Sequence, residues 1–210
     1  MKERPILFSA PMVRAILDGS KTQTRRVVKQ LDPKAGAVTT NMHSLPMSCC
    51  WAFGGPIILC PYGQPGDRLW VRETFGEFID TEVINGATYE LGRDWVYRAD
   101  GEGVRVSTRW KPSIHMPRDA SRILLEIVSV RVERLHDLSE GDAVAEGIER
   151  MPCAVPYTKL WKNYRPGNGC TPSMAIPQNS FRSLWESING EANWLSNPWV
   201  WVVEFKRVQS

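Results

Sequence analysis

The sequence predicts an α+β fold, a small mixed β-barrel with flanking helices and two long loop insertions. Three observations lead to this prediction. Segments in which apolar side chains alternate with polar ones recur along the chain and are typical of strands. Only two or three segments carry an apolar stripe at helical spacing. Two stretches rich in proline and glycine, residues 30–64 and 150–178, show no sustained period and are predicted loops. Five or so strands with few helices favour a barrel.

The predicted strands rest on this alternation. Valine recurs at every second position in the longest of them, at Val128, Val130 and Val132. Pro65-Gly66-Asp67 predicts a turn that leads into another. Strands are expected over residues 68–75, 94–99, 104–110, 122–135 and 199–208.

Three helices are predicted, over residues 9–19, 139–148 and 180–189. In the first, Ser9 is the expected N-cap and Pro11 suits the first turn. The second opens with a capping-box pattern, Ser139-x-x-Asp142. The third has an apolar stripe that we assign to the core and that Gly190 ends; its members are Phe181, Leu184, Trp185 and Ile188.

Length and composition indicate a single domain, residues 1–210. The net charge of +3, from 26 basic and 23 acidic side chains, permits an anionic ligand but does not indicate a general nucleic-acid binder. Five cysteines without a CxxC pair argue against disulfides and zinc, so we predict no metal and no cofactor. Without a membrane-length apolar run or a signal peptide at residues 1–17, a cytoplasmic protein with no membrane partner is expected.

The densest polar cluster spans residues 19–26. Composition alone favours a solvated basic loop. The spacing favours a site, because the amine of Lys21 and the hydroxyl of Thr24 are close enough in sequence for a lysine base to activate an alcohol or a water. Arg26 follows two residues later and suits a carboxylate or a phosphate.

Other candidates are spread along the chain. Alternation places Trp70 and Arg72 on one strand face and Glu73 on the other, and a tryptophan beside an arginine can stack on a base. His115 and Arg118 lie in and beside a proline-bounded loop and are candidate substrate contacts. Aromatic and basic side chains interleave over residues 157–165, a pattern of single-strand binding surfaces and also of loops that pack their aromatic residues.

The motif Gly19-x-Lys21-Thr22-x-Thr24-x-Arg26 resembles the signature of the ASCH domain family, which has a PUA-like β-barrel fold. Three further segments resemble that family, over residues 65–69, 138–140 and 199–206. Residues 9–12 and 111–118 are more similar to its larger, phage- or prophage-associated members. That subfamily often has an aromatic residue where this chain has Asp119. Relative to a minimal domain, residues 30–64 and 150–178 are insertions.

The resemblance implies an activity. Small bacterial members of the family are amidohydrolases that remove the acyl group from N4-acetylcytidine without a metal. Their catalytic lysine, threonine and glutamate fall on Lys21, Thr24 and Glu146, with Glu140 and Glu149 as alternatives for the acid. Lys21 would then be the base, Thr24 the nucleophile or water-positioner, and Glu146 the proton shuttle. The expected substrate contacts are Arg26, Trp70, Arg72, Glu73, His115 and Arg118.

Two other functions remain open at this point. The first is a binding module for RNA or modified nucleic acid, with or without ribonuclease activity. The second is a phage accessory protein whose barrel has lost catalysis. Whether the protein is an enzyme or a binding module, the expected partner is a modified nucleoside or RNA.

Overall fold

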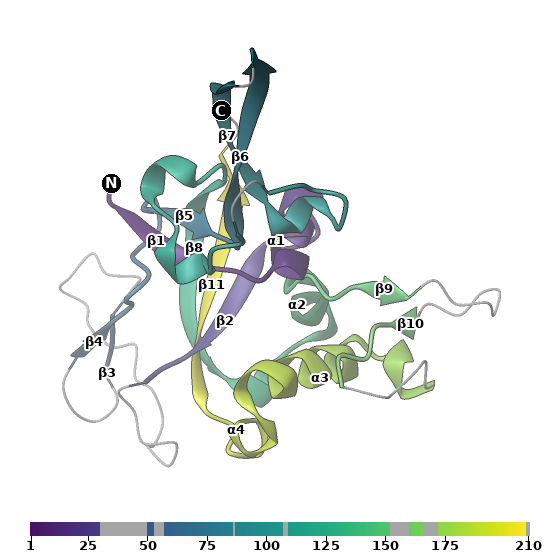
Figure 1. Ribbon diagram of the computed structural model, residues 1–210. Helices are drawn as coiled ribbons and strands as arrows, with labels where there is room; N and C mark the ends of the chain where they lie inside the picture. Colours follow the sequence, from purple (N-terminus) through teal and green to yellow (C-terminus); the bar gives the residue numbers. More distant parts are fainter. Residues whose placement is uncertain are drawn as a thin grey trace.

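A five-stranded mixed sheet forms the centre of the protein (Figure 1). The computed structural model describes residues 1–29, 50–52, 57–85, 87–106, 109–151, 160–165 and 172–208. The strand order is β1-β5-β8-β11-β2, with β1 parallel to β5 and every other pair antiparallel. These strands are β1 (Glu3–Leu7), β5 (Arg68–Arg72), β8 (Leu124–Arg134), β11 (Trp199–Arg207) and β2 (Gln23–Val27).

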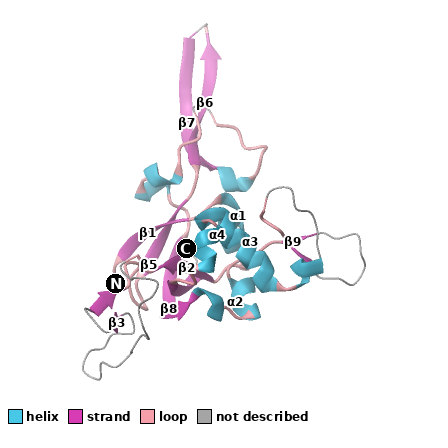
Figure 2. Cartoon of the chain, turned by 90° about the horizontal axis from the view of Figure 1, so that it is seen from below, coloured by secondary structure: helices cyan, strands magenta, loops and turns pink. Residues whose placement is uncertain are grey.

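Strand β11 is buried on both faces, which explains its nearly continuous apolar sequence. Trp201 and Val203 point into one hydrophobic cluster, which also contains the buried residues of α1 (Ala10–Leu17). Val200 and Val202 point into a second cluster, which contains buried residues of α2 (Glu140–Ala145) and α3 (Pro177–Asn189). The sheet therefore separates two cores. Figure 2 shows the helices gathered beside it.

The predicted helices are present, with corrections at their ends. Ser9 is the N-cap residue of α1, as predicted. Its side chain, however, makes no capping hydrogen bond. The capping box of α2 forms as predicted: the Asp142 amide donates to the Ser139 hydroxyl at 3.1 Å, and the Ser139 amide donates to the Asp142 carboxylate. Helix α3 begins three residues early because Pro177 suits its first turn, and it ends at Gly190 as predicted.

Strands predicted over 68–75, 122–135 and 199–208 are confirmed in β5, β8 and β11. The strand predicted over 94–99 is part of a longer hairpin, β6 (Phe75–Ile84) with β7 (Ala87–Tyr97), which projects away from the sheet (Figures 1 and 2). The prediction of a strand over 104–110 is wrong: the residues of this segment that the structure describes form no strand. This segment packs on the hairpin through side chains instead: Val106 fills the space beside Gly76.

Two strands near the amino terminus were not predicted. Strand β1 precedes α1, and β2 contains the second half of the polar cluster, for which composition alone favours a solvated loop. Gln23, Thr24 and Arg25 in β2 are all buried. A polar strand gives no alternation signal, because its burial depends on partners that lie far away in sequence.

The two proline- and glycine-rich stretches contain short strands, so the prediction of loops without regular structure is wrong in part. Residues 30–64 include β3 (Cys50–Ala52) paired with β4 (Ile57–Leu59), and residues 150–178 include β9 (Arg150–Met151) paired with β10 (Leu160–Trp161). The part of the chain that the structure describes also contains α4 (Glu191–Leu195) and five short 3-10 turns, η1 (Arg98–Asp100), η2 (Ser113–His115), η3 (Arg118–Ala120), η4 (Leu135–Asp137) and η5 (Pro172–Ala175). Residues 30–49, 53–56, 152–159 and 166–171 lie outside the described residues.

The α+β class is confirmed. In the described residues, strands β1 and β2 are the edges of the sheet, and no backbone ladder joins them. None of the helices in the described ranges is both long and apolar enough to cross a lipid bilayer.

Candidate functional site

The turn between α1 and β2 packs against the end of α2. The Lys21 amide donates to the Ala15 carbonyl at 2.8 Å, and the Thr22 amide donates to the Ala145 carbonyl at 2.9 Å. Lys21 also forms an isolated antiparallel bridge with Glu146. These backbone contacts bring together two side chains that are 125 positions apart in the sequence.

The side chain of Lys21 is fully buried and its ammonium group makes three hydrogen bonds. Nζ donates to Glu146 Oε2 at 3.0 Å, to the Glu146 carbonyl at 2.7 Å and to the Gln23 carbonyl at 2.8 Å. These acceptors use all three N–H groups of a lysine. No hydrogen bond joins Nζ to Thr24 in the described residues, so the direct contact that the sequence spacing implied is not made.

Burial lowers the pKa of Lys21, and the neighbouring Glu146 carboxylate opposes this shift without cancelling it. The positive charges of Arg26 and Arg25 lower the pKa further. A lysine in these surroundings gives up its proton more readily than an exposed one. Lys21 is therefore the kind of amine that can exchange a proton with the carboxylate beside it.

Arg25 holds the other oxygen of the same carboxylate and was missed by the sequence analysis. Its guanidinium, also fully buried, lies 3.3 Å from Glu146 Oε1, 3.0 Å from Glu133 Oε2 and 3.4 Å from Asp142 Oδ2. Burial acts to raise the pKa of Asp142, but its hydrogen bond with Ser139 and the charge of Arg25 together lower that pKa. Nothing in the local sequence distinguishes Arg25 from its neighbour, since its partners come from β8 and α2.

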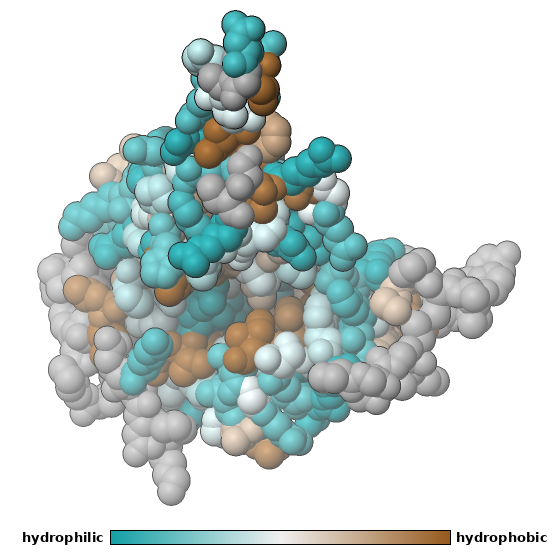
Figure 3. Space-filling model, viewed as in Figure 1, coloured by the Kyte–Doolittle hydropathy of each residue, from teal (hydrophilic) through white to brown (hydrophobic). Residues whose placement is uncertain are grey.

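A cavity of about 310 Å³ opens beside this network, between β2 and α3. Its volume lies near the lower end of the roughly 300–1,000 Å³ that is common for small-ligand sites. Thr24, Arg26 and Glu146 contribute polar groups to its wall, and α3 contributes apolar ones, with Tyr62 from the first insertion. Figure 3 shows hydrophobic side chains gathered where α3 passes below β2.

Two polar residues on the cavity wall have distinct environments. No described residue forms a hydrogen bond with the hydroxyl of Thr24, although the residue is only 3% exposed. Burial raises the pKa of Tyr62, so its phenol stays protonated at neutral pH. Tyr62 was not predicted either, because it lies in a stretch without a motif. Lys21 does not line the cavity, and it reaches the cavity only through Glu146.

The alternatives for the acid lie elsewhere. Glu149 forms an ion pair with Lys162 at 2.8 Å, and Glu140 is an exposed residue of the first turn of α2. Glu146 is the C-cap residue of α2 rather than a mid-helix residue. Of these three glutamates, only Glu146 contacts Lys21.

The predicted substrate contacts fall into three places. Arg26 lines the cavity, where its Nη2 donates to the Leu7 carbonyl at 2.8 Å. Glu73 is buried on the opposite side of β5 from Trp70, in an ion pair with Arg122 at 3.0 Å; burial raises its pKa and Arg122 opposes that shift. The remaining four do not line the cavity and belong to the outer side of β5 and the turns near it: Trp70, Arg72, His115 and Arg118.

The aromatic and basic segment over residues 157–165 packs against the protein where it is described. Trp161 is 7% exposed and belongs to the second core cluster, and the Tyr164 hydroxyl accepts a hydrogen bond from the Glu149 amide. Lys162 pairs with Glu149 and Arg165 pairs with Glu186. These contacts favour the packing interpretation. Tyr157 and Lys159 lie outside the described residues.

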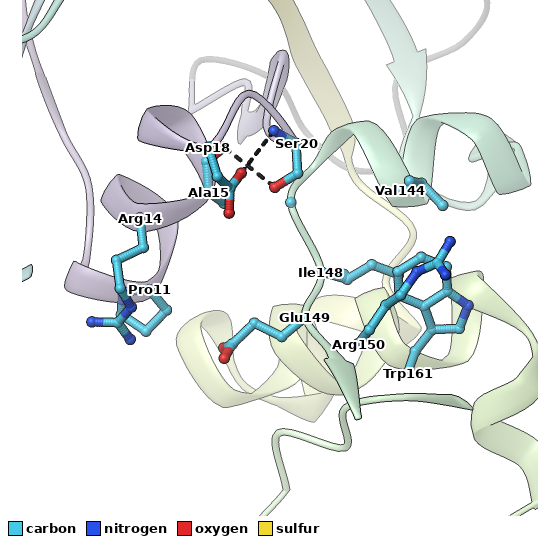
Figure 4. A pocket seen from close by; sticks show the side chains of 11 residues that line it. Pro11, Arg14, Ala15, Asp18, Ser20, Val144, Ile148, Glu149, Arg150 and Trp161 are labelled. Carbon is cyan, nitrogen blue, oxygen red and sulfur yellow. Dashed lines mark hydrogen bonds between the residues drawn. The ribbon is translucent and has the colours of Figure 1, made fainter. Parts of the chain in front are cut away.

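A second cavity, of about 530 Å³, lies where α1 faces the segment after α2 (Figure 4). Its wall includes Asp18 and Ser20 on one side and Arg150, which lies over the ring of Trp161, on the other. Of the predicted catalytic and substrate-binding residues, only Glu149, an alternative for the acid, lines it. Within the described ranges, no group of three or more metal-ligating side chains is present.

Together these features define an α+β protein with a buried, charged network beside a half-polar, half-apolar cavity. Comparisons of the chain with protein-family models, with curated proteins and with solved structures found no match.

Gly147 is predicted to be essential for the contact between Lys21 and Glu146. Its φ is +79°, and a Cβ there would lie 2.7 Å from the Cβ of Lys21 and 2.9 Å from that of Ala15. Gly19 is a matched control, because its φ is +81° but a Cβ would meet nothing within 4 Å. We expect Gly19→Ala to lower the free energy of unfolding by about 1–2 kcal/mol, and Gly147→Ala to lower it by clearly more. Denaturant unfolding measures both; equal losses would contradict this account.

Removing the charge of Glu146 is predicted to destabilise the protein more than removing the charge of Lys21. Glu146→Gln leaves two buried cations, Lys21 and Arg25, without their shared carboxylate and should cost about 3–5 kcal/mol. Lys21→Met should cost less, since Arg25 still balances Glu146. Denaturant unfolding of the single and double variants gives the coupling between the two side chains. A coupling energy near zero would contradict the ion pair.

The cost of Glu146→Gln should also depend on pH. Burial lowers the pKa of Lys21 in the folded state, and the substitution removes the carboxylate that opposes this shift. The unfolded chain then binds more protons than the folded one between that lowered pKa and 10.5, the ordinary lysine value. Stability of the variant should therefore rise with pH across this window, more steeply than that of the unmodified protein.

Proposed function

We propose that this chain is a metal-independent amidohydrolase that removes an acyl group from an N-acylated nucleoside such as N4-acetylcytidine. One observation carries the proposal: the Glu146 carboxylate lies 3.0 Å from a buried lysine amine and lines the same cavity as Thr24. Amide hydrolysis needs an activated nucleophile, a group that accepts its proton, and a donor for the departing nitrogen. Thr24, Glu146 and Lys21 supply these functions.

In this proposal the proton transfers occur in a definite order. The Thr24 hydroxyl, or a water that it positions, attacks the acyl carbon, and its proton passes to the Glu146–Lys21 pair. Glu146 is the group through which this proton travels, because Lys21 does not itself line the cavity. The C–N bond then breaks, and the proton returns to the departing amine. If Thr24 is the nucleophile, a water hydrolyses its ester; in either case one water is consumed.

Arg26 suits the negative charge that develops on the acyl oxygen. Its guanidinium lies at the cavity wall and is held by the Leu7 carbonyl and by the ring of Phe8, 5.4 Å away. A cation that is already positioned stabilises a transition state without reorganisation. The apolar side chains of α3 on the opposite wall strengthen such interactions by excluding water.

The same arginine supports a finer proposal about the fold, a PUA-like barrel of the ASCH type. Strands β1 and β2 are the two edges of the described sheet, and Arg26 of β2 donates to the backbone of β1. A side chain that spans the two edges is what a nearly closed sheet requires. In this proposal the cavity lies at the seam, and the single domain runs over residues 1–210.

Loss of the Thr24 hydroxyl is the sharpest test of the activity. Thr24→Val keeps the shape of the residue and its suitability for a strand, while Thr24→Ser keeps the hydroxyl. With N4-acetylcytidine as substrate and released cytidine as the readout, we expect Thr24→Val to lower kcat/KM by about 100-fold or more, and Thr24→Ser to retain most of it. An acetyl ester on Thr24, seen by mass spectrometry, would identify it as the nucleophile.

The absence of cytidine release by the unmodified protein, or full activity in Thr24→Val, would refute the hydrolase. Binding of RNA without hydrolysis, unaffected by Thr24→Val, would instead favour the second candidate, a nucleic-acid-binding module. That candidate draws support from the arginines that surround Trp70, described next.

A further inference from the structure

Two arginines lie around one tryptophan on the outer side of β5; Trp70, Arg72 and Arg118 are here called the Trp70 cluster. The Arg72 guanidinium lies 5.3 Å from the ring centre of Trp70, and that of Arg118 lies 6.0 Å from it. Arg72 is anchored by a hydrogen bond to the Ile114 carbonyl. Cation–π contacts of this kind hold guanidinium groups in place while leaving N–H groups for an anion.

The register of β1 and β5 places this cluster next to the cavity. Leu7 lines the cavity, and its Cα pairs with that of Arg72 in the parallel ladder. Paired residues of neighbouring strands are about 5 Å apart and share a face. Pro5 and Trp70 are the next pair on that face, about 6.6 Å further along. Arg26, Leu7, Arg72 and Trp70 therefore form a continuous row leading out of the cavity.

The side chains of this row carry positive charge, and acidic side chains balance that charge only weakly. Arg118 pairs with Glu3 at 3.0 Å, but both side chains are more than a third exposed. Exposed ion pairs contribute little to stability, so a stronger anion can displace Glu3. Since the arginines already occupy the surroundings of the Trp70 ring, a negatively charged oxygen group fits this cluster better than a stacked base. The planar donor forks of two arginines match a phosphate.

We propose that the Trp70 cluster binds a phosphate of the substrate while the acylated base occupies the cavity, so that the preferred substrate is a phosphorylated nucleoside. This inference rests on the proposed function and narrows its substrate class. The phosphate belongs either to a mononucleotide or to the backbone of an RNA strand. The cluster supplies binding energy at a distance from the reacting bond.

The experiment compares three substrates at low ionic strength: N4-acetylcytidine, its monophosphates, and a short single-stranded RNA that contains it. We expect kcat/KM to be at least tenfold higher for a phosphate-bearing substrate than for the nucleoside, with the advantage falling as salt is added. If only the RNA shows this advantage, the phosphate is that of a strand; if a monophosphate shows it equally, a mononucleotide suffices.

Arg118→Gln and the double variant with Arg72→Gln should reduce that advantage by at least tenfold. Arg150→Gln is the matched control, because Arg150 also lies over a tryptophan, Trp161, at 5.0 Å but at the second cavity. The control should retain the advantage. Equal kcat/KM for all substrates, or the same loss in the control, would overturn the proposal.

A failure of the hydrolase would be recognised separately. If no substrate is hydrolysed, the affinities of the same three ligands are measured directly by titration calorimetry. Tighter binding of the phosphate-bearing ligands that is lost in the Arg72 and Arg118 variants would support the phosphate site without the enzyme. Equal affinity for all three ligands, or no weakening in those variants, would overturn it.

Discussion

The buried pair of Lys21 and Glu146 is the interaction on which the site depends. Taking an ammonium and a carboxylate out of water costs several kcal/mol for each ion, and their attraction offsets this only when the remaining hydrogen-bonding groups are also satisfied. Lys21 meets that condition with three acceptors, two of them backbone or side-chain atoms of Glu146 itself. Because one residue accepts twice, the amine is fixed to the end of α2 rather than to a mobile side chain.

This pair also determines what surrounds it. Glu146 ends α2, and Gly147 turns the chain in a left-handed conformation that leaves room for the Lys21 side chain. Arg25 balances the second oxygen of Glu146 and joins it to the carboxylates of Glu133 and Asp142. The end of α1, strand β2, strand β8 and helix α2 are thus connected through one charged network. Such a network is most sensitive to loss of Glu146, since that change leaves both Lys21 and Arg25 without the carboxylate that they share.

Elements with a strong local signal were predictable from the sequence. The valine alternation in β8, the capping box at Ser139 and the stripe of α3 each depend on residues within one segment, and each is present. Strand β2 was not predictable in this way, because its buried Gln23 and Arg25 are stabilised by partners more than 100 positions away. The opposite error occurred at 104–110, where alternation reflects side-chain packing on a hairpin rather than backbone pairing.

The candidate site likewise contains residues that a local motif predicted and residues that it did not. The short motif around Lys21 and Thr24, together with Glu146, was enough to predict three residues that the structure places at or beside one cavity. Arg25 and Tyr62 were missed: one is hidden among similar cations, and the other lies in an insertion without a pattern. The predicted direct contact between Lys21 and Thr24 is not made: Lys21 contacts Glu146, which lines the same cavity as Thr24. That difference depends on side-chain direction and not on spacing.

Helix α3 gives the cavity a property that the charged network cannot provide. Its stripe was assigned to the core. Phe181 and Trp185 are buried there and Leu184 packs against them, but the assignment is wrong for Ile188, which is 57% exposed. All four side chains line the cavity. One wall of the cavity therefore carries hydroxyl, carboxylate and guanidinium groups, and the other is apolar. An apolar wall of this kind suits the flat face of a ring. In the proposed hydrolase, the substrate carries a polar, hydrolysable group on one side of a flat ring, which is the chemical character of an acylated nucleobase.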